Sequence, residues 1–185
     1  MSCKLLLSAA ALTTAFAAVP AFGQTAPPTS GVPATNASVS SQEFVKKAAI
    51  TGIYEIGAAR IAEQRSHDRS LDRFAARMIR DHGKNSSELK AVAKSIGLGV
   101  PERLDEKHRG LIEQLRSVGS RQFDATYDQQ QIQGHREAIA LFTGYMQHGD
   151  NPRLRQFAKA TLPVLEHHLH MAQALPVGPK MAGGR

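Results

Sequence analysis

The sequence predicts an all-α protein, a four-helix bundle with a short extra helix between the second and third long helices. Apolar residues recur at helical spacing along four long segments, which is the pattern of helices that bury one face. Glycine, proline and helix-capping residues separate these segments. No segment alternates apolar and polar residues with the period of a half-buried β-strand.

The first long helix is predicted over residues 41–65. Ser40 with Glu43 three places on forms a capping box, which marks the start of a helix. Glu55 projects onto the apolar side of this helix, so its carboxylate is predicted to be buried. Because the connection 66–69 is short, we expect this helix to pair antiparallel with the next one.

The second long helix, predicted over residues 70–96, carries the clearest apolar stripe. Two rows at seven-residue spacing form this stripe: Leu71, Met78, Asn85 and Val92, and then Ala75, His82, Leu89 and Ile96. A buried polar side chain costs about 1–3 kcal/mol unless a partner satisfies it. The stripe therefore predicts a partner for the imidazole of His82. Gly97 and Gly99 are expected to end the helix.

Three further helices are predicted, a short amphipathic one over 104–119 and long ones over 121–148 and 152–175. His135 lies on the inner face of the third long helix, near its middle. Pro152 suits the first turn of the fourth long helix, with Asp150 or Asn151 as its cap. His168 lies on the apolar stripe of this last helix.

Each long helix thus turns one ionisable residue inward at a similar height: Glu55, His82, His135 and His168. Three imidazoles and a carboxylate are a suitable ligand set for one transition-metal ion, Zn²⁺, Cu²⁺, Ni²⁺ or Fe²⁺. The alternative is a metal-free polar core in which Asn85, Gln131 and Tyr127 supply further hydrogen bonds. Because a half-satisfied buried cluster is costly, one of these two arrangements should hold in full.

The neighbours of these residues have less definite roles. Asp81 points about 100° away from His82 around the helix. It can hold a neighbouring arginine or orient a histidine as an outer acceptor. The other histidines are expected at the periphery or in solvent: His67, His108, His148, His167 and His170.

The sequence argues against several kinds of catalytic site. A di-iron bundle site needs Glu-x-x-His on two helices, but the residues three places before the buried histidines are Ile79, Ile132 and Leu165. There is no serine–histidine or cysteine–histidine nucleophile pattern and no phosphate-binding glycine-rich loop. We therefore do not predict an enzyme.

The N-terminal residues 1–23 are predicted to be a cleaved export signal, with Lys4 before an apolar run and small residues at the cleavage site. Residues 24–40 are expected to form a disordered linker, 41–175 the bundle domain and 176–185 a flexible tail. Cys3 precedes the apolar run, so it is not a lipoprotein cysteine. Cleavage removes this thiol, which suits an oxidising periplasm.

The chain is basic, with 23 Lys and Arg against 16 Asp and Glu, or a net charge of +7. Removal of Lys4 with the signal leaves +6. This charge favours contact with anionic lipid or lipopolysaccharide. The basic residues are spread along every helix without interleaved aromatic residues, so no nucleic-acid partner is expected.

Four groups of residues resemble a known family: Phe44, Ala48 and Glu55-Ile56-Gly57; Phe74-Ala75, Met78, Asp81-His82, Asn85 and Leu89; Phe123-Asp124, Tyr127, Gln131, His135 and Leu141-Phe142; and Leu162-Pro163, Leu165, His168 and Ala172. The family is a bacterial ferritin-like domain of unknown function, number four-one-four-two, whose members are often labelled outer-membrane proteins. The resemblance implies a ferritin-like four-helix bundle exported to the cell envelope, and no known reaction.

Two functions follow as expectations. The first is a periplasmic metal-binding protein, with or without association with the outer membrane, that uses the four inward residues. The second is a non-catalytic envelope or stress-related interaction module, whose metal-free polar core only fixes the register of the helices.

Overall fold

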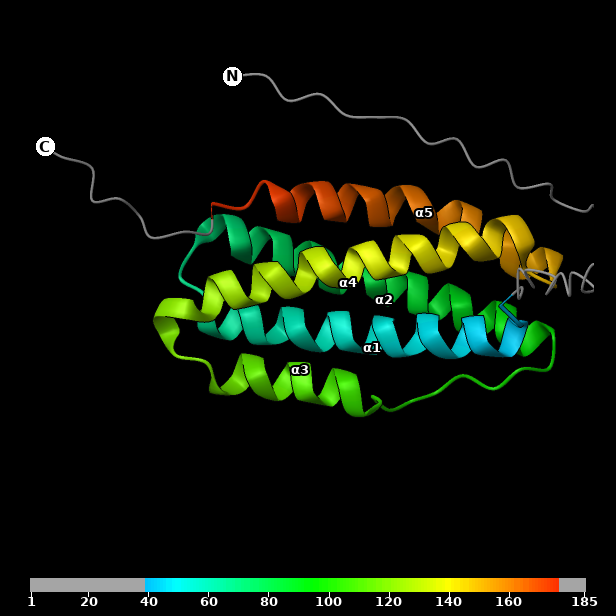
Figure 1. The fold of residues 1–185 in the computed structure, drawn as a ribbon, viewed down its shortest axis with the longest axis horizontal. Helices are drawn as coiled ribbons and strands as arrows, with labels where there is room; N and C mark the ends of the chain where they lie inside the picture. The colour runs from blue at the N-terminus through cyan, green and yellow to red at the C-terminus, as the bar shows by residue number, and fades with distance from the viewer. Residues whose placement is uncertain (1–38, 177–185) are drawn as a thin grey trace, which may run out of the picture. The chain divides into compact units, whose positions relative to one another are not determined.

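The computed structural model describes residues 39–176, which contain five helices. These are α1 (Ser41–Arg65), α2 (Arg69–Ser95), α3 (Glu106–Ser117), α4 (Ser120–His148) and α5 (Pro152–Gln173). The four long helices pack as a bundle, and α3 lies beside α1 (Figure 1). No strand occurs within these residues. The predicted fold class is confirmed, and the helix ends agree with the predicted ones to within about two residues.

Some predicted segments lie outside the described residues. These are the export signal at 1–23, the linker up to residue 38 and the tail from residue 177. Among the described helices, none is both long enough and apolar enough to cross a membrane.

The connection between α2 and α4 decides the topology. α1 and α2 run antiparallel, as do α4 and α5 (Figure 1). Residues 96–105 and α3 lead the chain back along the bundle, so α2 and α4 run in the same direction. The bundle therefore has a long crossover between α2 and α4 and not a simple up-down order.

Side-chain caps fix where the helices begin. The Ser40 hydroxyl accepts a hydrogen bond from the Glu43 backbone N–H (3.3 Å), as the capping box predicts. Asp68 caps α2 by accepting from the N–H groups of Ser70 and Leu71. Asn151 caps α5. These caps satisfy N–H groups that have no partner inside the helix.

The end of α2 depends on a glycine. Gly97 has φ of 75°, in the left-handed region that other residues rarely adopt. This conformation lets the Leu98 N–H donate to the Ala93 carbonyl at 2.9 Å, so the chain leaves the helix in a Schellman-type turn.

The apolar core is divided into two clusters. One contains Phe44, Leu89, Phe142, Tyr145, Leu154 and Phe157. The other contains Tyr54, Phe74, Met78, Leu115, Phe123 and Tyr127. Along α2 and α4, His82 and His135 fall between the residues of the two clusters. The buried histidines therefore form a polar layer inside the bundle.

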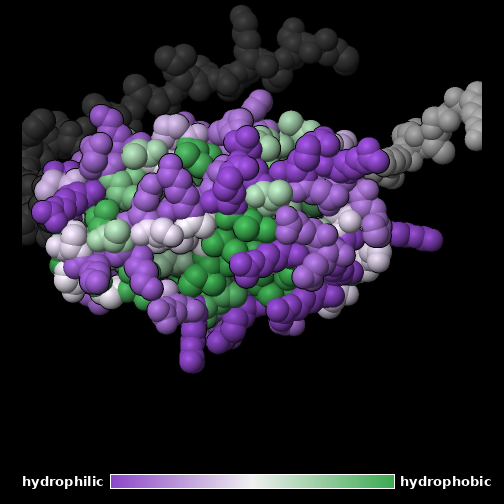
Figure 2. All heavy atoms as spheres, turned by 180° about the vertical axis from the view of Figure 1, so that it is seen from behind, coloured by the Kyte–Doolittle hydropathy of each residue, from purple (hydrophilic) through white to green (hydrophobic). Residues whose placement is uncertain are grey.

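The outer surface follows from the amphipathic helices. From behind, hydrophilic side chains cover most of the domain, with hydrophobic side chains showing in a strip between them (Figure 2). A bundle helix buries only one stripe and leaves the opposite face to solvent.

Candidate metal centre

Three predicted residues meet in the bundle interior. His82 on α2, His135 on α4 and His168 on α5 are 4 %, 1 % and 0 % exposed. One ring nitrogen from each lies within 4.8 Å of the other two, and the ring centroids are 5.3–5.7 Å apart. We call these three side chains the histidine cluster. Their helices come from both halves of the chain, so only the folded bundle creates the cluster.

The tautomer of His135 is set by its own helix. Its Nδ1 lies 2.8 Å from the backbone carbonyl oxygen of Gln131, one turn earlier. A carbonyl oxygen only accepts, so Nδ1 carries the proton. The lone pair is then on Nε2, which is buried and has no hydrogen-bond partner among the described residues.

His168 is oriented by a carboxylate from another helix. Its Nε2 lies 3.1 Å from Asp81 Oδ2 on α2, so Nε2 donates and the lone pair is on Nδ1. Nδ1 is buried without a partner within the described chain. Asp81 also accepts from Arg80 at 3.0 Å. Both predicted roles of Asp81 therefore occur together, since it holds an arginine and orients a histidine.

The third imidazole, His82, also has a buried nitrogen without a partner in the described structure, Nε2. Metal–nitrogen bonds of about 2.0–2.1 Å at tetrahedral angles place ligand nitrogens about 3.4 Å apart. The ring nitrogens, which lie within 4.8 Å of one another, are thus farther apart than in a closed tetrahedral site. A small inward movement of the three side chains would close the site. The donor set fits a transition-metal ion.

Burial keeps the three imidazoles neutral. It lowers the pKa of His82 well below its usual range, and the neighbouring His135 and His168 add to this. Burial lowers the pKa of His135 to about 4, although its bond to the Gln131 carbonyl opposes the shift. Burial also lowers the pKa of His168, against the opposing effect of Asp81. Metal binding requires the neutral imidazole, which is the form present at pH 7.

Glu55 is buried as predicted, at 1 % exposure, but it lies beside the histidine cluster rather than in it. Its Oε1 is 3.9 Å from Nδ1 of His135, the nitrogen that faces away from the free lone pair. Burial raises the pKa of Glu55 to about 8, although the nearby Gln131 amide opposes this. The Gln131 amide and the Glu55 carboxyl group do not reach hydrogen-bond geometry, so both Glu55 oxygens stay without a hydrogen-bond partner among the described residues.

The residues predicted to complete a metal-free network do not do so. Among the described residues, the amide nitrogen of Asn85, both side-chain polar atoms of Gln131 and the hydroxyl of Tyr127 have no hydrogen-bond partner. Gln131 instead holds the His135 ring through its backbone carbonyl, a role that sequence reasoning missed. The four-residue spacing from His135 on one helix was the available signal.

Of the histidines predicted at the periphery, His167 and His170 are exposed, as expected. His108 is half-buried instead. Its ring lies 5.2 Å from that of Tyr54, and its Nδ1 is 2.6 Å from Asp105. It therefore belongs to the packing of α3 on α1 and not to the histidine cluster.

The sequence model of the family described as "Domain of unknown function (DUF4142)" matches residues 26–175. The chain belongs to this DUF4142 family. The predicted resemblance is confirmed, and the match extends over the whole DUF4142 bundle described above.

No curated protein gives a significant match. Among solved structures, this DUF4142 chain is similar to one titled "CopM in the Cu(II)-bound form". The TM-score is 0.62 at 17 % identity, covering 72 % of this chain and 93 % of that chain. At this identity the likeness concerns the fold.

Asp81 gives a first test of the site. Asp81→Asn is expected to weaken metal binding by about tenfold, because a neutral amide holds His168 less firmly than a carboxylate does. The measurement is a competition titration with a chromogenic chelator. Glu88→Gln, which removes an exposed acid from the same helix, is the matched control. Equal affinities for the two variants would show that Asp81 does not support the site.

Proposed function

We propose that this protein binds one transition-metal ion at the histidine cluster, with copper as the first candidate. One observation carries the proposal. Three buried ring nitrogens have no partner within the described structure, while the opposite nitrogens of His135 and His168 are held by Gln131 and Asp81. Metal-ligating histidines characteristically donate their other ring N–H to a carbonyl or a carboxylate in this way.

Two arguments favour copper. Nitrogen sites bind Cu²⁺ more tightly than the other divalent ions of the first transition row, and imidazole is a suitable ligand for it. In addition, a structure with the same fold is titled as Cu(II)-bound. Zn²⁺, Ni²⁺ and Fe²⁺ remain the comparison ions for any binding experiment.

The metal-free interaction module is the weaker proposal. It needs a closed hydrogen-bond network, yet the polar atoms of Gln131 and the hydroxyl of Tyr127 have no partner among the described residues. Buried polar atoms without partners cost about 1–3 kcal/mol each. A bound ion that takes the three imidazole lone pairs offsets part of this cost.

The proposed place of action is the periplasm. It rests on the export signal predicted at residues 1–23, and the basic charge of the chain supports association with an anionic membrane surface. Binding to vesicles with and without anionic lipid tests the membrane part of this proposal.

The decisive experiment measures metal binding by protein purified without a polyhistidine tag. Elemental analysis after incubation with Cu²⁺ is expected to give one equivalent per chain. A ligand that binds only the folded state at a hundredfold excess over its dissociation constant adds about 2.7 kcal/mol to the stability. The thermal unfolding temperature should rise accordingly. Less than about 0.1 equivalent of any transition metal, with no thermal shift, would contradict the proposed function.

A further inference from the structure

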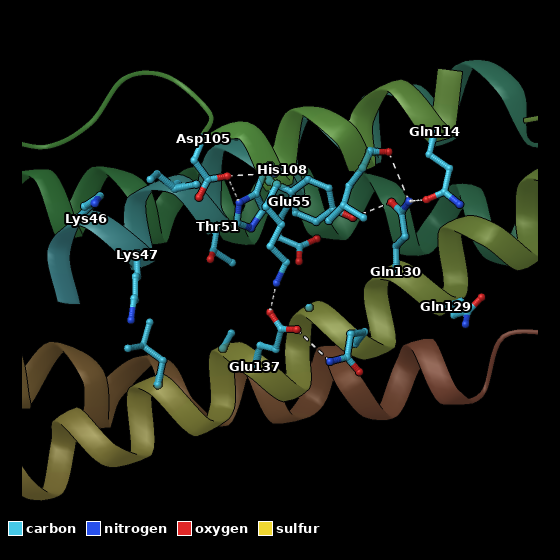
Figure 3. Close-up of a pocket in the computed structure, with 18 of the residues that line it drawn as sticks. Lys46, Lys47, Thr51, Glu55, Asp105, His108, Gln114, Gln129, Gln130 and Glu137 are labelled. Atoms are coloured by element: carbon cyan, nitrogen blue, oxygen red, sulfur yellow. Dashed lines mark hydrogen bonds and ion pairs between the residues drawn. The ribbon is translucent and has the colours of Figure 1, made fainter. Parts of the chain in front are cut away.

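A cleft of about 720 Å³ lies between α1, α3 and α4, and the otherwise buried Glu55 is part of its lining. Its size falls within the range of about 300–1,000 Å³ that is usual for ligand sites. In Figure 3 the Glu55 carboxylate points from α1 into this space, toward the side on which Glu137 of α4 lies. Neither Glu55 oxygen has a hydrogen-bond partner among the described residues.

Glu55 lies between this cleft and the His135 ring of the histidine cluster. One of its oxygens, Oε1, is 3.9 Å from His135 Nδ1. The same oxygen would lie 2.9 Å from a Cβ atom at Gly134, closer than real Cβ contacts allow. The glycine on α4 therefore leaves the space that the carboxylate occupies. The arrangement is a carboxylate with free oxygens, placed between a polar cavity and one of the three imidazoles.

We propose that this cleft is the port through which the metal ion reaches the histidine cluster, and that Glu55 is the first buried ligand that the ion meets. This inference rests on the proposed function. Carboxylate oxygen binds the same ions that imidazole binds.

The other approaches to the histidine cluster are less suitable. A crevice lined by His82, Gly52 and Ser86 has a volume of about 20 Å³. This is room for about one or two waters, too little for a hydrated metal ion. Near His168, Arg77 and Arg80 lie against the Asp81 carboxylate that holds this histidine. Their positive charges repel an approaching cation.

The charged side chains that line the cleft do not exclude a metal ion from it. Lysines and acidic residues both contribute: Lys46, Lys47, Lys107, Glu43, Asp105 and Glu137. Lys107 and Glu137 form an ion pair of 2.6 Å between α3 and α4, and both side chains are about half exposed. An exposed pair of this kind is worth only about 0–1 kcal/mol, so it separates readily.

The test measures the rate of Cu²⁺ uptake separately from the affinity. Stopped-flow tyrosine fluorescence follows uptake, because the chain has three Tyr and no Trp. Glu55→Gln keeps the shape but removes the carboxylate, and Gly134→Ala fills the space that Oε1 occupies. Both are expected to slow uptake by about tenfold. Equilibrium affinity should stay within about threefold of wild type, since the three imidazoles remain.

Two controls make the kinetic result specific. Gly144→Ala changes another glycine of α4, where a Cβ has nothing within 4 Å, and it should match the wild-type rate. Ser86→Leu fills the crevice beside His82 and should also leave uptake unchanged. Thermal unfolding confirms that each variant folds. Alanine is favoured over glycine inside a helix by about 1 kcal/mol, so neither glycine variant is expected to lose its fold.

Two outcomes would refute the proposal that the metal ion enters through this cleft. One is uptake at the wild-type rate in either Glu55→Gln or Gly134→Ala. The other is a loss of equilibrium affinity of about tenfold or more in Glu55→Gln, which would make Glu55 a ligand of the finally bound ion. Wild-type protein that binds no Cu²⁺ at equilibrium is a separate result, since it refutes the proposed function and the port together.

Discussion

Replacing His168 with Leu is expected to lower the affinity for Cu²⁺ by roughly a hundredfold, because the ion loses one of three imidazole ligands. Without metal, the same change should cost little stability. A leucine removes a buried Nδ1 that has no partner in the described structure, and it leaves Asp81, which is partly exposed, with its bonds to arginine. Competition titration gives the affinity, and chemical denaturation of the metal-free protein gives the stability.

The matched control for this variant is His170→Leu. This histidine lies on the same helix, two residues further on, and it is exposed. His170→Leu should leave both affinity and stability unchanged. Equal losses of affinity in the two variants would point to metal binding at the exposed histidines of α5, and the proposed centre would then be wrong.

The stability of the metal-free protein is expected to be highest near pH 6.5. Glu55 has a pKa of about 8 in the folded protein and about 4.5 ordinarily, so the folded state holds a proton that the unfolded state has lost. Taken alone, this titration lowers the stability by about 1.6 kcal/mol between pH 6.5 and 8, and the histidines of the unfolded state, which lose their remaining protons over the same range, offset about half of that fall. Below pH 6.5 the unfolded histidines take up protons while His135, with a pKa of about 4, does not, so stability falls there as well.

Denaturant titrations of metal-free protein at several pH values check this profile. In Glu55→Gln the decrease above pH 6.5 should become a small rise, because only the histidines titrate there, and the decrease on the acid side should stay in place. Asp128, whose pKa burial raises to about 6, modifies the slope only below that pH. A wild-type stability that rises between pH 6.5 and 8 as much as that of Glu55→Gln would show that Glu55 is ionised in the folded state.

The fold was predictable because local chemistry determines it. Ser40, Asn151 and Pro152 mark helix starts with their own side chains, and Gly97 marks an end through its positive φ. The inward position of His135 also followed from the sequence, because helical period alone decides which face a residue occupies. These features depend on neighbours within one or two turns.

The pairing inside the core was not predictable in the same way. Heights along the bundle axis placed Glu55 level with the three histidines, and the structure places it beside His135 but outside the histidine cluster. A height fixes the position along a helix and says nothing about which of two adjacent helices a side chain faces. The cleft was missed for the same reason, since it depends on where α3 packs and on the small Gly134.

The histidine cluster takes its side chains from α2, α4 and α5 and none from α1 or α3. An ion held there would act as a cross-link among three helices while leaving the other two unfastened. Hydrogen exchange would then slow most in the three tethered helices, and α1 with α3 could still open as a separate unit.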